Sequence, residues 1–315
     1  MMNGASIVIT GAAGFTGRHA CLHYLELGMK VTALTRKEDP ELVSMGATVT
    51  VCDLLDTNVL TAAIQKAQPD YLLHLAGMNS VPASWKQPVQ AMESNVIGTL
   101  NVLNAIRLIP HVRVVVVTSK LKTPLVRLRE PEHPYALSKS FQEISALAWG
   151  KLFGLDISLV EPSNLIGPGR STGVCALIGQ YIANHERGWN HDTFLFSSRQ
   201  QLRDYLDVRD AVSAYEKLLI HGEAGSVYSV QSGKLRTLGE VAATFRKYAL
   251  TDILFRWQDD SAPLADEVES DTAETVSSFP IETDTGLPKA WGWEPIRSFE
   301  HSVADILNYY RNGEG

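Results

Sequence analysis

The chain has 315 residues, of which 45% are hydrophobic, and it carries a formal net charge of −7. This length and hydrophobic content suffice for a large core and predict one doubly wound domain with a smaller second lobe. The negative charge without a basic stripe argues against nucleic-acid binding, and the lack of a long apolar run argues against a membrane span.

Short apolar, β-branched runs alternate with segments of helical apolar spacing along the first half of the chain. This alternation predicts a Rossmann-type α/β fold, in which helices cover both faces of a doubly wound parallel sheet. The expected strands are residues 6–9, 30–34, 48–52, 71–75, 112–118 and 157–160. The expected helices are residues 14–27, 57–68, 89–109 and 135–153. The unbroken apolar run 114–117 indicates a central strand that is buried on both faces.

A glycine-rich turn joins the first expected strand to the first expected helix. Gly11 permits the sharp turn, Gly14 lets the backbone approach phosphates, and Gly17 lets the helix and the strand pack closely. The start of the following helix supplies free N–H groups and the positive end of a dipole for an anion. The sequence therefore predicts dinucleotide binding at this turn, and the alternative is an ordinary strand-to-helix turn.

Tyr135 and Lys139 are four residues apart at the start of the last expected helix, so they share one helical face. A nearby ammonium lowers the pKa of a phenol from about 10 towards the working pH. We therefore interpret Tyr135 as an acid/base and Lys139 as the group that tunes it. The alternative is an ordinary surface pair.

The rhythm of the pattern changes after residue 161. Further expected elements are a loop at 163–169, helices at 174–185 and 208–220, and a strand at 226–230. We assign residues 1–161 plus about 205–230 to the dinucleotide-binding domain, and about 162–204 and 231–315 to a smaller C-terminal α/β substrate lobe. The acidic segment 259–278 is expected to be a loop or flap.

The three cysteines, Cys21, Cys52 and Cys175, are scattered and show no spacing typical of metal ligands. We therefore expect no metal site, and we interpret the cysteines as small core residues in a reducing compartment. The chain enters its first expected strand without a secretory leader, which predicts a cytoplasmic location.

The motifs, taken in order, resemble those of the extended short-chain dehydrogenase/reductases that modify nucleotide-activated sugars. The resemblance covers nearly the whole chain and is carried by residues 10–17, 53–54, 74–77, 94–99, 135–139, 161–169, 203–210 and 291–295. The pattern is most similar to the GDP-4-keto-6-deoxy-mannose reductase type, notably in residues 70–107 and in the loop 166–169. The resemblance implies an oxidoreductase that acts on a nucleotide sugar.

Roles for individual residues follow from this resemblance. Tyr135 is implied to exchange a proton with the sugar while the nicotinamide exchanges hydride, and Lys139 to bind the nicotinamide ribose. Asn95 is implied to be a buried support of the active site, and Asp53 to accept a hydrogen bond from the adenine amino group. The expected cofactor-binding residues are Gly11, Ala13, Gly14, Phe15, Thr16, Gly17, Arg36, Lys37, Asp53, Leu54, Leu75, Ala76, Gly77, Asn95, Thr118, Tyr135, Lys139, Pro162 and Leu165. The expected substrate-binding residues are Ser84, Asn164 and Arg203, with Arg203 bonded to the diphosphate or else one charge of a solvated loop.

The end of the second expected strand favours NADP(H) over NAD(H). Arg36 and Lys37 follow Thr35, where NAD-specific members of the family carry an aspartate for the ribose diol. The two cations suit a 2′-phosphate, and the alternative is a solvated basic turn.

The chain departs from the family pattern in two places. The family carries a catalytic Ser or Thr just after the fifth strand, and our alignment places Lys120 there, with Ser119 one residue earlier. A lysine at this place is similar to the acid/base of C5-inverting UDP-N-acetylglucosamine 4,6-dehydratases, since a desolvated lysine titrates near neutrality. Lys120 is thus a candidate catalytic residue, with Ser119 or Thr118 as the alternative source of the hydroxyl. Residues 262–267 lack the arginine with which many relatives clamp the diphosphate.

We therefore expect an NADP(H)-dependent oxidoreductase that transfers hydride at C4 of a nucleotide-diphosphate hexose. Lys120 favours a UDP-N-acetylhexosamine derivative and a proton transfer at C5 or C6, similar in kind to the second enzyme of a CMP-pseudaminic acid pathway. The alternatives are a simple NDP-4-keto-6-deoxy-sugar reductase or 4-epimerase (GDP-mannose type), or a non-catalytic NADP(H)-binding redox sensor. By analogy with relatives, the wide apolar surfaces of helices 89–109 and 135–153 predict a homodimer with a four-helix interface.

Overall fold

The computed structural model describes residues 2–124, 127–189, 193–258 and 286–313. The chain divides into two units, which are described separately. Unit 1 comprises Met1–Ser163, Val208–Val230 and Leu287–Pro295, and unit 2 comprises Asn164–Asp207, Gln231–Gly286 and Ile296–Gly315. Residues 205–207 therefore lie in unit 2 and residues 287–295 in unit 1, the reverse of the sequence-based assignment. The acidic segment 259–278 lies outside the described residues.

Unit 1 is built on a seven-stranded sheet with the strand order β10-β6-β5-β4-β1-β2-β3, and every pairing in it is parallel. The strands are β1 Ser6–Thr10, β2 Lys30–Thr35, β3 Thr48–Val51, β4 Tyr71–His74, β5 Arg113–Val117, β6 Asp156–Pro162 and β10 Val227–Val230. The strand order reverses between β1 and β4, the switch point at which doubly wound sheets bind nucleotides. The predicted Rossmann-type fold is confirmed.

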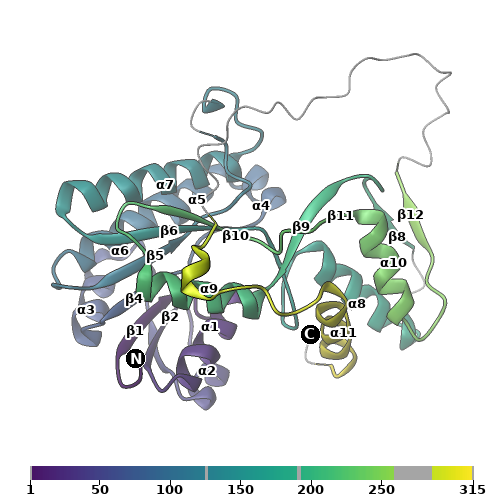
Figure 1. Ribbon diagram of the computed structural model, residues 1–315, viewed down its shortest axis with the longest axis horizontal. Helices are drawn as coiled ribbons and strands as arrows, with labels where there is room; N and C mark the ends of the chain where they lie inside the picture. Colours follow the sequence, from purple (N-terminus) through teal and green to yellow (C-terminus); the bar gives the residue numbers. More distant parts are fainter. Residues whose placement is uncertain (1, 125–126, 190–192, 259–285, 314–315) are drawn as a thin grey trace. The chain divides into compact units, whose positions relative to one another are not determined.

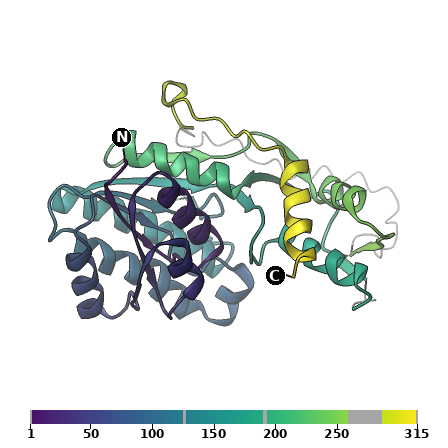
Figure 2. The same cartoon turned by 90° about the horizontal axis from the view of Figure 1, so that it is seen from below.

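Two groups of helices flank this sheet on opposite faces (Figures 1 and 2). Helix α1 packs against α9 and α2, whereas α6 packs against both α3 and α7. The helices are α1 Phe15–Glu26, α2 Pro40–Met45, α3 Thr57–Ala67, α4 Val81–Lys86, α5 Pro88–Met92, α6 Gly98–Ile106, α7 Pro134–Phe153 and α9 Val208–His221. The single helix predicted at 89–109 is wrong in detail, because a π-helix at Glu93–Ile97 separates α5 from α6. Such π-helical turns are frequent at functional sites.

The centre of the sheet is apolar on both faces, as the run 114–117 predicted. Val114, Val115 and Val116 are fully buried, and Val117, at the end of β5, is only half-buried. Leu72 on β4 and Leu159 on β6 pack with Val114 and Val116 against the helices of one face. This rigid core holds the carboxyl ends of β1, β4, β5 and β6, where the polar motifs begin.

Unit 2 has a three-stranded sheet of order β11-β9-β7 and a two-stranded sheet β12-β8. Its elements are β7 Asn164–Ile166, α8 Val174–Glu186, β8 Phe194–Phe196, β9 Leu202–Asp207, β11 Leu235–Thr237, α10 Leu238–Tyr248, β12 Phe255–Trp257 and α11 Phe299–Arg311. Ile178, Phe245 and Ile306 bring α8, α10 and α11 together in one apolar cluster. The loop predicted at 163–169 is partly wrong, because Asn164–Ile166 pairs with β9 as a strand.

Candidate active site

The glycine-rich turn after β1 has the geometry that the sequence predicted for a phosphate cradle. Gly11 has φ +67°, and a Cβ there would lie 2.8 Å from the Ala76 backbone. A Cβ on Gly17 would lie 2.2 Å from the Gly11 carbonyl oxygen, so helix and turn touch backbone to backbone. Gly14 is the N-cap of α1, and no side chain caps the first turn of that helix. The start of α1 thus offers N–H groups that no capping side chain occupies, as an anion site requires.

The carboxyl ends of β2 and β3 present the residues expected to contact the adenosine part of a cofactor. Arg36 and Lys37 are exposed directly after β2. The next buried carboxylate, Asp39, is bound to Arg18 at 2.7 Å and caps α2. Asp53, after β3, is exposed, and its carboxylate accepts a hydrogen bond from the Leu55 N–H at 3.0 Å. The end of β2 thus presents two exposed cations, the charge that a 2′-phosphate requires.

The end of β4 is held by buried polar side chains. Thr10 Oγ1 accepts hydrogen bonds from the N–H groups of Leu75 and Ala76. Asn95 lies in the π-helix and is fully buried, and its amide bonds the Met78 N–H at 2.7 Å and the Met78 carbonyl at 3.0 Å. Its Nδ2 also donates to Ser138 Oγ at 2.8 Å, so Asn95 ties this loop to α7. A Cβ on residue 77 would lie 2.5 Å from Asn95 Oδ1, which explains why glycine stands there.

Tyr135 lies at the start of α7 and is only 6% exposed. Its N–H donates to Ser84 Oγ at 3.1 Å, and the His133 ring stacks on the phenol with a centroid distance of 5.9 Å. The hydroxyl of Tyr135 is hydrogen-bonded to the Ser119 side chain. Burial raises the pKa of Tyr135, and the Ser119 hydrogen bond opposes that rise. The prediction that Lys139 lowers this pKa is wrong for the protein alone, because burial dominates.

Lys139 is one turn further along α7, and it is 5% exposed. Its ammonium donates to Gln142 Oε1 at 2.8 Å and to the Val117 carbonyl at 3.3 Å. Burial lowers the pKa of Lys139 to about 8. Gln142 belongs to none of the motifs in the sequence, although its position three residues after Lys139 places it on the same helical face.

A chain of buried hydrogen bonds links Gln142 to the strand that precedes the glycine-rich turn. Gln142 Nε2 donates to Thr99 Oγ1 at 2.9 Å, Thr99 contacts His74 at 2.8 Å, and His74 contacts Thr10 at 2.8 Å. Burial, assisted by the Lys139 charge, lowers the pKa of His74 to about 3, so its imidazole is neutral. The Thr99 hydroxyl donates to the Asn95 carbonyl at 2.7 Å, so His74 Nε2 carries the proton in this arrangement. Buried hydrogen bonds thus connect Lys139 to Thr10, the last residue of β1 before the glycine-rich turn.

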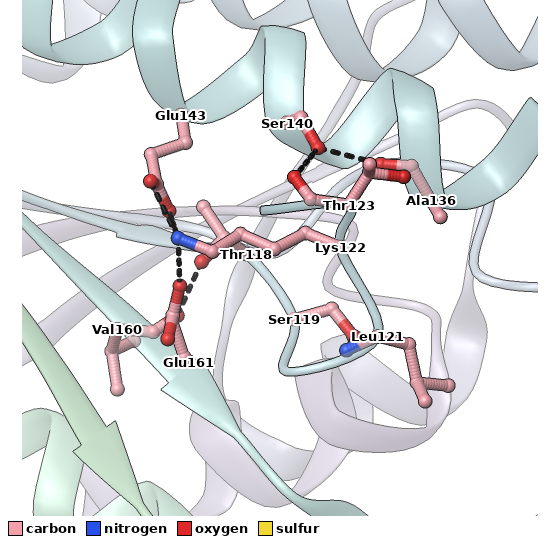
Figure 3. A network of polar contacts seen from close by, with 10 residues as sticks. All are labelled: Thr118, Ser119, Leu121, Lys122, Thr123, Ala136, Ser140, Glu143, Val160 and Glu161. Carbon is pink, nitrogen blue, oxygen red and sulfur yellow. Dashed lines mark hydrogen bonds and ion pairs between the residues drawn. The ribbon is translucent and has the colours of Figure 1, made fainter. Parts of the chain in front are cut away.

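The loop after β5 carries the departure from the family pattern (Figure 3). Thr118 donates to the Val160 carbonyl at 3.1 Å, and Ser119 Oγ accepts from the Leu121 N–H at 3.1 Å. Of the two candidates, Ser119 is the one whose side chain is bonded to Tyr135. The catalytic role of Lys120 stays a prediction. Lys120 is half-buried, and its N–H donates to the carbonyl of Pro162 at the end of β6.

The three residues expected to bind substrate have different surroundings. Ser84 is fully buried, donates to the Val81 carbonyl at 2.7 Å and accepts from the Tyr135 N–H, so it positions Tyr135 from within the protein. Asn164 lies on β7 in unit 2, next to Leu165, and its Nδ2 donates to the Asp204 carbonyl at 2.9 Å. Arg203 lies on β9, also in unit 2, and is half-buried.

The three cysteines are buried and form no disulfide, as expected of small core residues. Within residues 2–124, 127–189, 193–258 and 286–313, no group of three or more His, Cys, Asp or Glu side chains is arranged to hold a metal ion. None of the helices in these ranges has both the length and the apolar character needed to cross a membrane.

The chain is similar in sequence to enzymes that modify nucleotide sugars. The family model described as "NAD dependent epimerase/dehydratase family" matches residues 7–230. The chain is 31% identical over 259 residues to the GDP-6-deoxy-D-mannose reductase of Pseudomonas aeruginosa, a match that spans 78% of this chain and 81% of that protein. It is 27% identical over 333 residues to a dTDP-glucose 4,6-dehydratase of Xanthomonas campestris pv. campestris, across 97% of this chain and 93% of that protein.

Solved structures show the same architecture. The structure of RMD from Pseudomonas aeruginosa complexed with NADPH superposes with a TM-score of 0.74 at 26% identity, and covers 98% of this chain and 99% of that one. UDP-glucose 4-epimerase from Thermotoga maritima, solved with UDP-glucose, gives a TM-score of 0.80 at 20% identity and covers 98% of this chain and 100% of that one. At that lower identity the second likeness shows the fold alone.

Proposed function

Since the chain belongs to the NAD-dependent epimerase/dehydratase family, we propose that it reduces a nucleotide-linked 4-keto-6-deoxyhexose with NADPH. The observation that carries this proposal is the hydrogen bond between Ser119 and the buried phenol of Tyr135, with Lys139 one helical turn away. The relative with 31% identity is named as a reductase of this kind. The sequence analysis preferred proton transfer by Lys120 on a UDP-N-acetylhexosamine. The Ser119 contact favours the simple reductase, because Ser119 supplies the hydroxyl that the family carries beside its catalytic tyrosine.

The residues at the carboxyl ends of β1 and β2 fit a dinucleotide that carries a 2′-phosphate. The glycine turn allows backbone approach where a Cβ would collide, and the start of α1 offers uncapped N–H groups. Arg36 and Lys37 would hold the 2′-phosphate, and Asp53 the adenine amino group. When bound, the reduced nicotinamide supplies the hydride for C4 of the sugar.

The protein's own groups supply the proton and its control. Tyr135 donates its phenolic proton to the C4 oxygen, and its raised pKa keeps that proton in place at neutral pH, which suits the direction of ketone reduction. Ser119 orients the phenol through its hydroxyl. Lys139, as an ammonium below its pKa of about 8, supplies positive charge beside the site. Asn164 and Arg203 remain our candidates for binding the nucleotide sugar, Arg203 through charge-assisted bonds to phosphate.

We also propose that two copies of the chain associate through α6 and α7. The chain just before and just after α6 exposes Val89, Ile97 and Leu108, and α7 exposes Phe141, Leu152 and Phe153. Exposed apolar side chains in this number are typical of a surface that a partner covers. Sedimentation velocity that returned the mass of a single chain at micromolar concentration would contradict this association.

The reaction is tested in deuterated water by assaying GDP-4-keto-6-deoxymannose with NADPH and UDP-N-acetylglucosamine derivatives with NADP+. We expect turnover of the 4-keto-6-deoxy sugar without solvent deuterium at C5, because reduction at C4 leaves the C5–H bond intact. Ser119→Ala is expected to lower kcat by about 10²-fold, as for loss of one group that orients the acid, and Lys120→Ala by about threefold at most.

The matched pair of variants separates the two mechanisms. Deuterium at C5 of a UDP-N-acetylhexosamine, abolished in Lys120→Ala and retained in Ser119→Ala, would replace the reductase proposal by the lysine mechanism. If the wild type turns over none of these substrates, a non-catalytic redox sensor becomes the better description.

A further inference from the structure

One largely buried ion cluster has no role in the chemistry proposed above. Lys122, on the loop after β5, lies between Glu143 of α7 and Glu161 of β6 (Figure 3). Its Nζ donates to both Glu143 oxygens at 2.5 Å and also pairs with Glu161. The side chains of Lys122, Glu143 and Glu161 are 19%, 5% and 14% exposed. A single cation therefore joins three different elements of unit 1.

The charges of the cluster balance only if the two carboxylates share a proton. Burial raises the pKa of Glu161 to about 7, an effect that Lys122 opposes and Glu143 reinforces. Burial disfavours the ammonium of Lys122, but the two glutamates outweigh it and raise the Lys122 pKa. With Glu161 protonated, the cluster holds the Lys122–Glu143 ion pair and one carboxylic acid, and it is neutral. The residue paired with Glu161 on β10, Ser229, adds no charge.

The loop that carries Lys122 also carries Ser119, three residues earlier. Besides the contact of Ser119 with Tyr135, single hydrogen bonds hold this loop to its neighbours. They include Ser140 Oγ to the Thr123 carbonyl at 2.6 Å, the Thr123 N–H to the Ala136 carbonyl at 3.4 Å and the Lys120 N–H to the Pro162 carbonyl at 3.4 Å. The Lys122 cluster adds ion pairs to these bonds, and it reaches both α7, which bears Tyr135, and β6.

We propose that Lys122 is a positioning residue whose ammonium, held between Glu143 and Glu161, locks the 119–123 loop and so keeps Ser119 against Tyr135. The catalytic part of this inference rests on the proposed function, whereas the locking of the loop does not. Removing the cation leaves two carboxylates facing each other without a partner, and the loop loses its link to both elements. Raising the pH through the titration of Glu161 removes the shared proton and leaves two carboxylates on one ammonium. The cluster then carries a net negative charge, which burial and the repulsion by Glu143 disfavour, so the closed loop is destabilised.

The locking is tested by hydrogen–deuterium exchange of the protein without cofactor. The N–H groups of Lys120, Lys122 and Thr123 are hydrogen-bonded, so their protection reports the closed loop. Lys122→Met is expected to speed exchange of the peptide covering 119–123 by about tenfold or more, and Lys151→Met, an exposed lysine on the same helix as Glu143, to leave it unchanged. Equal exchange in Lys122→Met and wild type would overturn the proposal.

A second variant keeps the test valid if Lys122→Met fails to fold. Glu161→Gln mimics the protonated acid, so it removes the titration of Glu161 from the cluster. We expect wild-type exchange of the loop to accelerate between pH 6.5 and 8.5, after correction for intrinsic rates, and exchange in Glu161→Gln to stay constant. The same acceleration in both proteins would contradict the shared proton and the role of the cluster.

Kinetics then test the link to Ser119. Lys122→Met is expected to lower kcat on the 4-keto sugar by about 10-fold to 100-fold, the effect of a slightly misplaced group, while KM for NADPH changes less than about twofold. A purely structural role would change both constants or neither. If the wild type turns over no nucleotide sugar, the proposed function fails, and the exchange data alone still decide whether Lys122 locks the loop.

Discussion

Tyr135→Phe is expected to lower kcat for the 4-keto sugar by about 10³-fold, because it removes the proton donor and keeps the ring. The phenol is buried and bonded to Ser119, and its backbone N–H is bound by Ser84, so the ring of the variant should keep its place. KM for NADPH should change little, since the lost group acts in the transition state. Steady-state kinetics with NADPH absorbance measure both constants.

Tyr71→Phe is the matched control for this experiment. Tyr71 starts β4, at the opposite end of that strand from the loop that contacts Asn95. Its variant should keep wild-type kcat within about twofold. Equal turnover by Tyr135→Phe and the wild type would remove Tyr135 from the chemistry and would favour a sensor function.

Lys139→Met is expected to lower kcat by about 10²-fold and to weaken NADPH binding by about tenfold, because it deletes the buried ammonium beside the site. The pKa of Lys139 lies at about 8, below its ordinary value of 10.5, so the charge is present below that pH and is lost as the pH rises through it. Wild-type affinity for NADPH should therefore fall above pH 8. The affinity of Lys139→Met should be flat across the same range.

Fluorescence titration of NADPH between pH 6.5 and 9.5 measures this difference. Because Met leaves Gln142 Oε1 without its donor, Lys139→Met/Gln142→Leu is the variant that separates charge from an unsatisfied amide. The double variant should match Lys139→Met in its flat pH profile. A pH dependence that persists in the variants would assign the titration to another group.

Much of unit 1 was predictable because its signals are local. The alternating runs reproduce the strands of the seven-stranded sheet to within two residues, and the glycines of the β1–α1 turn lie where backbone contacts exclude a Cβ. Val114–Val116 are buried because a central parallel strand is covered on both faces. The strands follow from short-range periodicity, and the tight turn follows from the missing side chain of its glycines.

The features that the sequence did not predict depend on contacts between segments that are far apart in the chain. Asn164–Ile166 becomes a strand only because β9 pairs with it, about forty residues later in the chain. A one-residue difference after β5 decides whether Ser119 or Lys120 meets Tyr135, and no pattern in the sequence settles that register. The pKa of Tyr135 follows burial, which the four-residue spacing to Lys139 does not report.

The ion cluster shows the same limitation. Lys122, Glu143 and Glu161 come from a loop, a helix and a strand, so only the fold brings them together. Glu143, four residues after Lys139, and Glu161, before Pro162, were visible as charged residues in otherwise apolar segments. A buried charge of this kind indicates a partner but does not say which one. The homodimer and the roles of Asn164 and Arg203 stay predictions.

Transfer of label from cofactor to sugar tests the central claim most directly. The protein is incubated in ordinary water with GDP-4-keto-6-deoxymannose and NADPH deuterated at C4 of the nicotinamide, in both stereoisomers. The account predicts that one isomer places deuterium at C4 of the hexose, with none at C5, and that Tyr135→Phe slows this transfer. Deuterium that never reaches the sugar, or a product altered at C5 with C4 unlabelled, would contradict it.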